Sequence, residues 1–114
     1  MKRFVARCTP WGTVQTGELF TLLTDAEKSA VLMHEQAHIR NHDALRRLWW
    51  VLSLKIVFRA QWVFAECRRQ EYAADAYACE RGHGAGLRSF LRRFPQTSSP
   101  LYPGTRQRLE ALNG

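Results

Sequence analysis

The segment TDAEKSAVLMHEQAHIRNHD, residues 24–43, defines the main helix of this chain. Thr24 and Glu27 have the spacing of a capping box, in which the threonine side chain accepts a hydrogen bond from the backbone N–H of the glutamate and the glutamate side chain accepts one in return. Beyond this box, apolar residues recur at helical spacing as far as Ala37. The pattern therefore predicts a helix that begins after Thr24 and runs to about Asp43 or beyond.

This helix carries His34-Glu35-Gln36-Ala37-His38. Two histidines four residues apart lie about 40° apart around a helix and one turn apart along it. Both imidazoles can therefore reach a single ion at the zinc–nitrogen distance of ~2.0–2.1 Å. Glu35 lies beside such an ion, where a carboxylate can act as general base towards a water molecule acidified by the metal. The pattern predicts a zinc site with His34 and His38 as ligands and Glu35 as the catalytic base.

An H-E-x-x-H pattern can also arise by chance on a charged helix, and its alternative interpretation is a solvated helix face. Val31, Ala37 and Ile39 argue against this, because they place the helix in the core of the protein. Three titratable side chains in a core are costly unless something pairs them. The surroundings of the motif therefore favour the metal site.

The third zinc ligand does not come from the residues directly after the motif. The metzincin pattern requires a histidine ten residues after the first one, where this chain has Ala44. His42 continues the four-residue series, but it would lie too far along the helix to share the ion. We interpret His42 as a surface histidine or one that supports a ligand.

Better candidates lie in a downstream helix. Glu71 and Asp75 share one helix face by their spacing, so Glu71 could bind zinc while Asp75 orients a ligand histidine through its second ring nitrogen. Small side chains would let this helix approach the first one closely: Ala73, Ala74, Ala76 and Ala78. Two alternatives remain open, an exposed acidic pair neutralised by Arg68 and Arg69, and Glu66 as a rival ligand.

The remaining elements follow from local composition. The β-prone residues 3–8 and 12–16 predict a short hairpin, and residues 18–23 a helical turn. Helices are expected at about 45–58, 63–80, 85–94 and 105–112, with a Pro/Ser-rich loop at 95–104. The helix at 45–58 either continues the preceding helix or follows a break near residues 41–43. The fold class is mainly α (α+β), a compact zincin-like helical domain with a small N-terminal β-hairpin, an active-site helix and a glutamate helix. Residues 1–114 form a single domain.

Composition limits the class of protein. The 114 residues are 46% hydrophobic and 24% charged, which is typical of one globular domain with a modest core. The three cysteines, Cys8, Cys67 and Cys79, form no C-x-x-C pair, which favours free thiols and a reducing compartment. No signal peptide is recognisable at the N-terminus. We therefore expect a cytoplasmic protein, with peripheral membrane association as an option.

The formal charge of +7 permits an acidic partner. A solvated basic surface is the simplest explanation, and the chain has no pattern of a nucleic-acid module, so no nucleic acid is expected as a partner. The longest apolar stretch, residues 48–58, contains Lys55 and is too short to span a bilayer, which takes ~20 apolar residues. It predicts a buried helix, with peripheral membrane contact through Trp49, Trp50 and Trp62 as the alternative.

The two motifs together, residues 34–38 and Glu71-Tyr72-Ala73-Ala74-Asp75, resemble the HtpX and CAAX prenyl-protease type of gluzincin peptidase, and particularly its minimal soluble members, the minigluzincins. In that family an H-E-x-x-H helix is followed by a helix carrying E-x-x-x-D. The likeness covers nearly the whole chain from Thr13. It implies a zinc metalloendopeptidase with Zn²⁺ as its cofactor, acting on peptides or unfolded proteins.

Near the C-terminus, members of this family often carry a His-Pro pair with an arginine six residues after the histidine. Both residues are thought to hold the substrate carbonyl and the developing oxyanion. Here Tyr102-Pro103 stands in place of the pair, and Arg108 fits the arginine. The resemblance thus implies catalytic roles for Arg108 and Tyr102, because a phenol can also donate to an oxyanion. A loop tyrosine without a catalytic role is the alternative.

The resemblance further implies that a strand around Thr13 to Thr16 binds peptide by β-addition. A domain of 114 residues leaves room only for a shallow, open groove, which suits flexible chains. Two other functions stay in competition with peptide-bond hydrolysis. One is a regulatory module that holds zinc without turnover, and the other is a basic protein that docks on a membrane or nucleic acid.

Overall fold

The structure, a computed structural model, describes residues 5–113. Its elements in chain order are β1 (Ala6–Cys8), β2 (Val14–Thr16), the 3-10 helix η1 (Glu18–Leu22), α1 (Asp25–Arg40), α2 (Asp43–Leu52), α3 (Lys55–Phe58), α4 (Ala60–Ala78), the π-helical turn η2 (Cys79–His83), α5 (Gly84–Arg93) and α6 (Thr105–Asn113). The strands form a two-stranded antiparallel sheet. The predicted α+β class and the hairpin are confirmed, although residues 3 and 4 of the predicted first strand lie outside the described residues.

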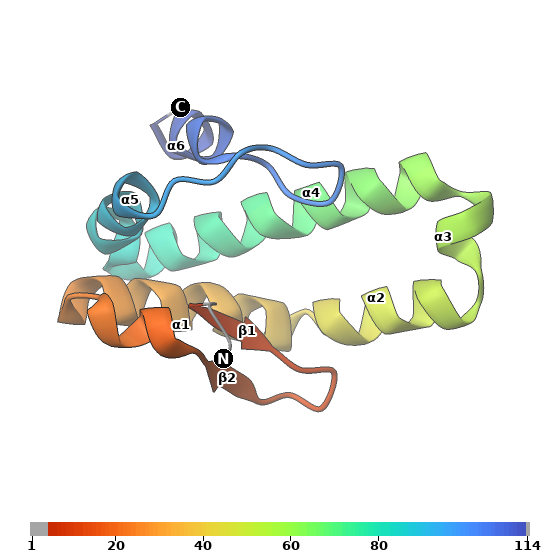
Figure 1. Ribbon diagram of the computed structural model, residues 1–114, viewed down its shortest axis with the longest axis horizontal. Helices are drawn as coiled ribbons and strands as arrows, with labels where there is room; N and C mark the ends of the chain where they lie inside the picture. Colours follow the sequence, from red (N-terminus) through yellow and green to blue (C-terminus); the bar gives the residue numbers. More distant parts are fainter. Residues whose placement is uncertain (1–4, 114) are drawn as a thin grey trace.

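Two long helices form the frame of the molecule (Figure 1). The chain runs along α1, continues into α2, turns at α3 and returns along α4, so that α1 and α4 lie side by side. The hairpin lies against α1, while α5 and α6 lie at the end of the molecule remote from α3. The core lies between α1, α4 and α5 and consists of Leu23, Ala30, Val31, Ala78, Leu87, Phe90 and Leu91.

The start of α1 is fixed by the predicted capping box. Thr24 Oγ1 accepts from the Glu27 backbone N–H at 3.2 Å, and Glu27 accepts from the Thr24 N–H at 2.9 Å. Glu27 is fully buried, and its carboxylate also accepts hydrogen bonds from Ser89 and Arg93 of α5. A Cβ at Gly86 would lie 2.4 Å from the Ala26 carbonyl oxygen, so this glycine permits the close approach of α5 to α1. The beginning of α1 is therefore held in place by α5.

Two predicted helix boundaries were wrong, and a third follows one of the two predicted alternatives. α1 ends at Arg40, and His42 takes a left-handed conformation (φ 55°) before α2 begins at Asp43, which confirms the alternative of a break near residues 41–43. The predicted helix 45–58 is broken at Leu54, which is also left-handed (φ 60°), into α2 and the short α3. α4 begins at Ala60, three residues earlier than predicted. Neither break carries glycine or proline, and for the break at Leu54 the composition gave no signal.

The prediction of a buried helix at residues 48–58 was also wrong. Trp50 packs with Val63 and Cys67 in a small second core, but most of its apolar neighbours are exposed, up to 76% for Phe58. Among the helices of residues 5–113, none has the length and apolar character needed to cross a bilayer. The three cysteines are free thiols, as predicted.

Candidate metal centre

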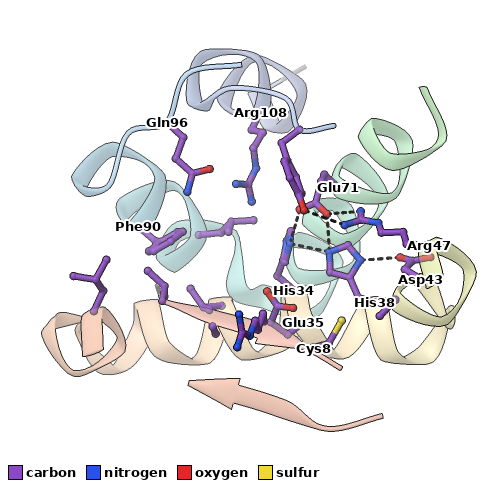
Figure 2. A pocket seen from close by; sticks show the side chains of 18 residues that line it. Cys8, His34, Glu35, His38, Asp43, Arg47, Glu71, Phe90, Gln96 and Arg108 are labelled. Carbon is purple, nitrogen blue, oxygen red and sulfur yellow. Dashed lines mark hydrogen bonds and ion pairs between the residues drawn. The ribbon is translucent and has the colours of Figure 1, made fainter. Parts of the chain in front are cut away.

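Three side chains from two helices converge at the middle of the frame (Figure 2). His34 and His38 come from α1 and Glu71 from the facing turn of α4. The two histidine Nε2 atoms lie 3.1 Å apart, and they lie 3.2 and 3.0 Å from the two Glu71 carboxylate oxygens. Within the described part of the chain, these three residues form the group whose ligand atoms all lie within 4.8 Å of one another.

The second ring nitrogen of each histidine is held by an aspartate. His34 Nδ1 lies 2.7 Å from Asp75 Oδ1, and His38 Nδ1 lies 2.7 Å from Asp43 Oδ2. A carboxylate at this distance keeps the proton on Nδ1, so in the neutral rings both Nε2 lone pairs face the Glu71 carboxylate. The two nitrogen lone pairs and the negatively charged carboxylate repel one another unless a cation lies among them.

This geometry fits a metal ion. Two ligands of a tetrahedral zinc site lie roughly 3.4 Å apart, since each is ~2.0–2.1 Å from the ion. The separations of 3.0 to 3.2 Å in the structure are close to that value. The donor set of two imidazoles and one carboxylate is also one that catalytic zinc sites use. The residues present therefore suit a divalent metal such as zinc.

The same repulsion shifts the pKa values of the three groups. Burial alone would lower the pKa of His34, but its hydrogen bonds with Asp75 and Glu71 outweigh burial and raise the pKa to about 10. Burial alone would raise the pKa of Glu71, yet the two histidines hold it well below its ordinary value. The metal-free pocket thus attracts positive charge, which a proton supplies when no metal does.

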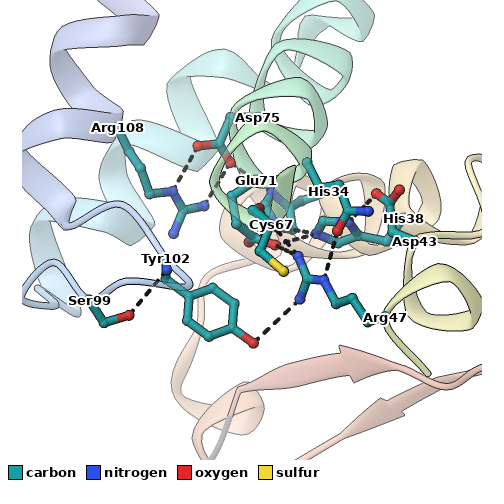
Figure 3. Close-up of polar contacts among 11 residues, drawn as sticks. His34, His38, Asp43, Arg47, Cys67, Glu71, Asp75, Ser99, Tyr102 and Arg108 are labelled. Carbon is teal, nitrogen blue, oxygen red and sulfur yellow. Dashed lines mark hydrogen bonds and ion pairs between the residues drawn. The ribbon is translucent and has the colours of Figure 1, made fainter. Parts of the chain in front are cut away.

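Arg108 of α6 supports the centre through Asp75 (Figure 3). Its Nε and Nη2 atoms each donate to one Asp75 oxygen at 2.7 Å, which is the paired geometry of a strong arginine–carboxylate contact. Both side chains are buried. Arg108 also lines the cleft, and within residues 5–113 its third nitrogen, Nη1, has no hydrogen-bond partner. Asp75 and Arg108, which were predicted as separate site residues, both lie at the centre and pair with each other.

Arg47 of α2 holds the other side of Glu71 (Figure 3). Its Nη2 atom donates to Glu71 Oε2 at 3.0 Å, and its Nε atom donates to Gln70 Oε1 at 2.7 Å. The Nη1 atom lies 3.4 Å from the Tyr102 hydroxyl oxygen, with the guanidinium 5.5 Å from the tyrosine ring centre. Tyr102, 44% exposed, therefore lies at the rim of the site beside Arg47.

Glu35 lies in the cleft that opens beside the three ligand residues (Figure 2). The cleft has a volume of about 650 Å³ and is lined by residues from β1, α1, α2, α4, α5 and the C-terminal segment. Burial raises the pKa of the Glu35 carboxyl above its ordinary value, although the two histidines partly offset this. Cys8 faces the same space, and burial together with Glu35 raises the pKa of its thiol to about 11. Glu35 thus lies in a position to exchange protons within the cleft.

The strand that lines the cleft is β1, and not the predicted segment Thr13 to Thr16. The Gly17 N–H donates to the Val5 carbonyl and the Thr9 N–H to the Thr13 carbonyl, so the odd-numbered residues of β1 bond to β2. In an antiparallel ladder the alternate residues point their backbone groups the other way. The N–H and C=O groups of Ala6 and Cys8 therefore face away from β2.

The rival ligands lie elsewhere. Glu66 pairs with Arg69 through bonds of 3.1 and 2.5 Å, and Arg68 donates to the Pro100 carbonyl. His42 lies exposed at the start of α2 and borders a separate small pocket. The predicted alternative, in which Arg68 and Arg69 neutralise Glu71 and Asp75, is therefore wrong, because other arginines contact these carboxylates.

The sequence analysis missed Asp43 and Arg47. Asp43 reaches His38 only because α1 ends at Arg40 and the chain turns at His42, so the two side chains meet across a break that the sequence left as one of two alternatives. Arg47 is one of many arginines, and nothing in its spacing distinguishes it. An aspartate five residues after the second histidine was the one available signal.

We expect Asp43→Asn to lower zinc affinity by about ten- to a hundredfold, the usual effect of losing a carboxylate that orients a metal-bound histidine. The asparagine keeps the size of the side chain but cannot hold the Nδ1 proton as firmly. Titration with a competing chelator measures the affinity. Asp25→Asn, an exposed position in the first turn of α1, is the control. Equal affinity in all three proteins would contradict an orienting role for Asp43.

Comparison with known proteins places the chain in a family. The sequence model of Peptidase family M48 matches residues 8–67, which is more than half of the chain and includes β2, α1, α2 and α3. The match ends before Glu71, so the family model does not include the third member of the cluster. No curated protein and no solved structure matches the chain. With its paired histidines on α1 inside the matched segment, this chain belongs to Peptidase family M48, a family of metal-dependent peptidases.

Proposed function

We propose that this protein is a zinc metalloendopeptidase of the minimal gluzincin kind, similar to the HtpX and CAAX prenyl-protease peptidases, and that it cleaves flexible peptide segments. The observation that supports this best is the convergence of His34, His38 and Glu71 to within 4.8 Å beside a cleft that also holds Glu35. The H-E-x-x-H sequence supplies the ligands and the base in the spacing that such chemistry uses.

His34, His38 and Glu71 would hold the ion. Bound zinc supplies Lewis acidity, which polarises the scissile carbonyl and lowers the pKa of water towards ~7. Asp75 and Asp43 fix the ring orientation of the two histidines, and Arg47 and Arg108 hold the carboxylates of Glu71 and Asp75 in turn. Side chains of α2, α4 and α6, as well as those of α1, therefore hold the site in place.

Glu35 acts first as the general base and then as the general acid. Its carboxylate removes a proton from the attacking water and returns it to the nitrogen of the leaving amine, so that no net proton is consumed. The raised pKa of Glu35 suits this return, because a weaker acid holds the proton until the amine takes it. The residue lies one position after His34 and opens onto the cleft where a peptide would lie.

The carbonyl oxygen of the substrate would receive hydrogen bonds from Arg108 and Tyr102. Two of the three nitrogens of Arg108 donate to Asp75, which leaves Nη1 available to the cleft. The Tyr102 oxygen already accepts from Arg47, so its own O–H can donate outwards. Donors aimed at a developing oxyanion lower the barrier of acyl transfer.

The peptide would add to the free edge of β1 as an extra strand. The backbone groups of Ala6 and Cys8 face away from β2, and the side chains of residues 5–8 line the cleft. Backbone hydrogen bonds of this kind recognise an extended chain whatever its side chains. Substrates of this peptidase are therefore extended, flexible segments.

A proline placed at Ala6 tests this edge, since it removes an N–H that does not serve the sheet. We expect Ala6→Pro to raise KM about three- to tenfold, the worth of one hydrogen bond. Thr16→Pro is the matched control, because Thr16 lies directly opposite Ala6 and its N–H faces the outer edge of β2. Steady-state cleavage of an unstructured peptide gives KM. An equal rise in both variants would locate the peptide elsewhere.

The proposed function is tested by removing and restoring the metal. Purified protein should carry about one zinc ion per chain, cleave a reduced and alkylated protein, lose the activity with a chelator and regain it with zinc. A protein that neither holds nor takes up zinc would contradict the proposal. A protein that holds zinc but cleaves no unstructured substrate would point to a regulatory zinc module instead.

A further inference from the structure

A second surface of the molecule has no part in the metal centre. Among residues 5–113, eight of the twelve exposed large apolar side chains lie between residues 45 and 62, where α2 turns through α3 into α4. We call the most exposed of these the apolar tip: Trp49, Val51, Leu52, Leu54, Val57 and Phe58, with exposures from 51 to 76%. Figure 1 shows α3 at the far end of the long axis, remote from α5 and α6. Large exposed apolar side chains gathered at one end of a molecule mark an interaction site.

The apolar tip is ordered by the residues beneath it. Trp50 is buried between α2 and α4, where it packs with Val63 and Cys67 and meets the Trp62 ring edge-on at 5.3 Å. Leu54 joins α2 to α3 in a left-handed conformation (φ 60°), which for leucine is strained. The small inner core fixes the two helices, so the outward side chains are not a loosened part of that core.

The charged residues in the segment that forms the apolar tip are all basic. Residues 44–65 contain four basic residues, Arg46, Arg47, Lys55 and Arg59, and no acidic one. Arg47 is engaged by Glu71, whereas Arg46 and Arg59 are exposed and Lys55 lies 3.9 Å from the centre of the Trp62 ring. Glu66 lies within electrostatic reach of Arg46 and Lys55, but it pairs with Arg69, so the border of the apolar tip carries an excess of positive charge.

We infer that the apolar tip inserts into the surface of an anionic lipid membrane. Tryptophan, phenylalanine and leucine bordered by arginine and lysine are the composition of interfacial membrane anchors, in which the apolar residues enter the acyl boundary and the cations contact anionic headgroups. A convex end of a helical hairpin suits a soft, flat surface, whereas a protein partner would need a matching groove. No helix of residues 5–113 can cross a bilayer, so the contact is interfacial.

Vesicle co-sedimentation tests the inference with the zinc-loaded Glu35→Gln chain, so the result is independent of peptidase activity. The probe is a vesicle of 30% phosphatidylglycerol in phosphatidylcholine, with phosphatidylcholine alone as reference. We expect binding to the anionic vesicles, lowered about tenfold by Leu52→Ser or Phe58→Ser, since each removes a large side chain from hydrocarbon. The matched control is Leu22→Ser, which has similar exposure (59%) but lies in η1, before the start of α1.

Two further variants distinguish a loss of folding from a loss of lipid contact, and the effect of charge from the effect of apolar area. Leu54→Asn suits the left-handed backbone, so it should lower binding without loss of thermal stability. Arg46→Gln combined with Arg59→Gln should lower binding to anionic vesicles by about tenfold or more, at roughly 1 kcal/mol for each charge, whereas Arg92→Gln with Arg106→Gln should change it less. Equal loss of binding in the Leu22 control, or equal binding to both vesicle types, would overturn the inference. The inference would also be overturned if the wild-type chain bound neither type of vesicle and instead formed dimers that the Leu52→Ser substitution dissociates.

Discussion

The Glu35→Gln protein is expected to keep its zinc and to hydrolyse peptide bonds about a hundred- to ten-thousandfold more slowly than the wild type. Glutamine has the size of glutamate and can accept a hydrogen bond, but it cannot take up a proton from water at neutral pH. Glu35 is not one of the three residues whose ligand atoms converge, so its loss should not remove the ion. Single-turnover cleavage of an unstructured peptide, with the zinc content of the same sample, measures both effects.

Gln36→Ala is the control for this variant, because Gln36 is the exposed neighbour of Glu35 on α1 and should change neither activity nor zinc content. A Glu35→Gln protein with activity within threefold of the wild type would show that the base is another group. A variant that loses its zinc as well would assign Glu35 to holding the ion instead of moving the proton.

Glu71→Gln is expected to weaken zinc binding on the order of a hundred- to a thousandfold, if the roughly 10–16 kcal/mol of a four-ligand zinc site is shared about evenly among its ligands. The amide still accepts a hydrogen bond from Arg47, so the variant should fold, but it lacks the charge that draws the ion. Activity should fall in parallel, because the chemistry depends on the metal. Competition with a chromogenic chelator gives the affinity of each protein directly.

Glu66→Gln provides the matched comparison, since Glu66 lies on the same helix and pairs with Arg69 at the surface. His42→Ala extends the comparison to the histidine at the start of α2. Both should bind zinc like the wild type. A thermal melt in the presence of chelator checks that Glu71→Gln is folded when no metal is bound. Similar zinc affinities in the three variants would show that the third ligand is not Glu71.

The sequence predicted the fold best where local rules act alone. The capping box at Thr24 and Glu27 fixed the start of α1, and the periodicity after it fixed the helix that carries His34 and His38. The helix of Glu71 could be found because its residues repeat at the helical period, as α4 does in the structure. The relation between Glu71 and the histidines did not follow from periodicity, and the resemblance to the gluzincins supplied it.

What the sequence did not predict depends on tertiary contacts. The break at His42 was only one of two alternatives, and the break at Leu54 uses a left-handed leucine, which no local preference predicts. Asp43 reaches His38 only across the first of these breaks. The exposed apolar tip follows from the second, because a continuous helix over residues 45–58 would place a different set of side chains outside. The sequence therefore predicted buried side chains at this end of the molecule, where most of the apolar side chains are exposed.

The continuity of α2 has a geometric consequence. One rigid helix begins at Asp43, beside the metal ligands, and ends at Leu52, in the apolar tip, so the two lie about 14 Å apart along its axis at 1.5 Å per residue. When the tip rests in a bilayer, the height of the cleft above the lipid is set by this length. An extended substrate gains ~3.3 Å per residue, so a chain leaving the membrane would need roughly four residues to reach Glu35. Cleavage of a bilayer-anchored peptide series should peak near that spacer length, and a flat dependence on spacer length would contradict it.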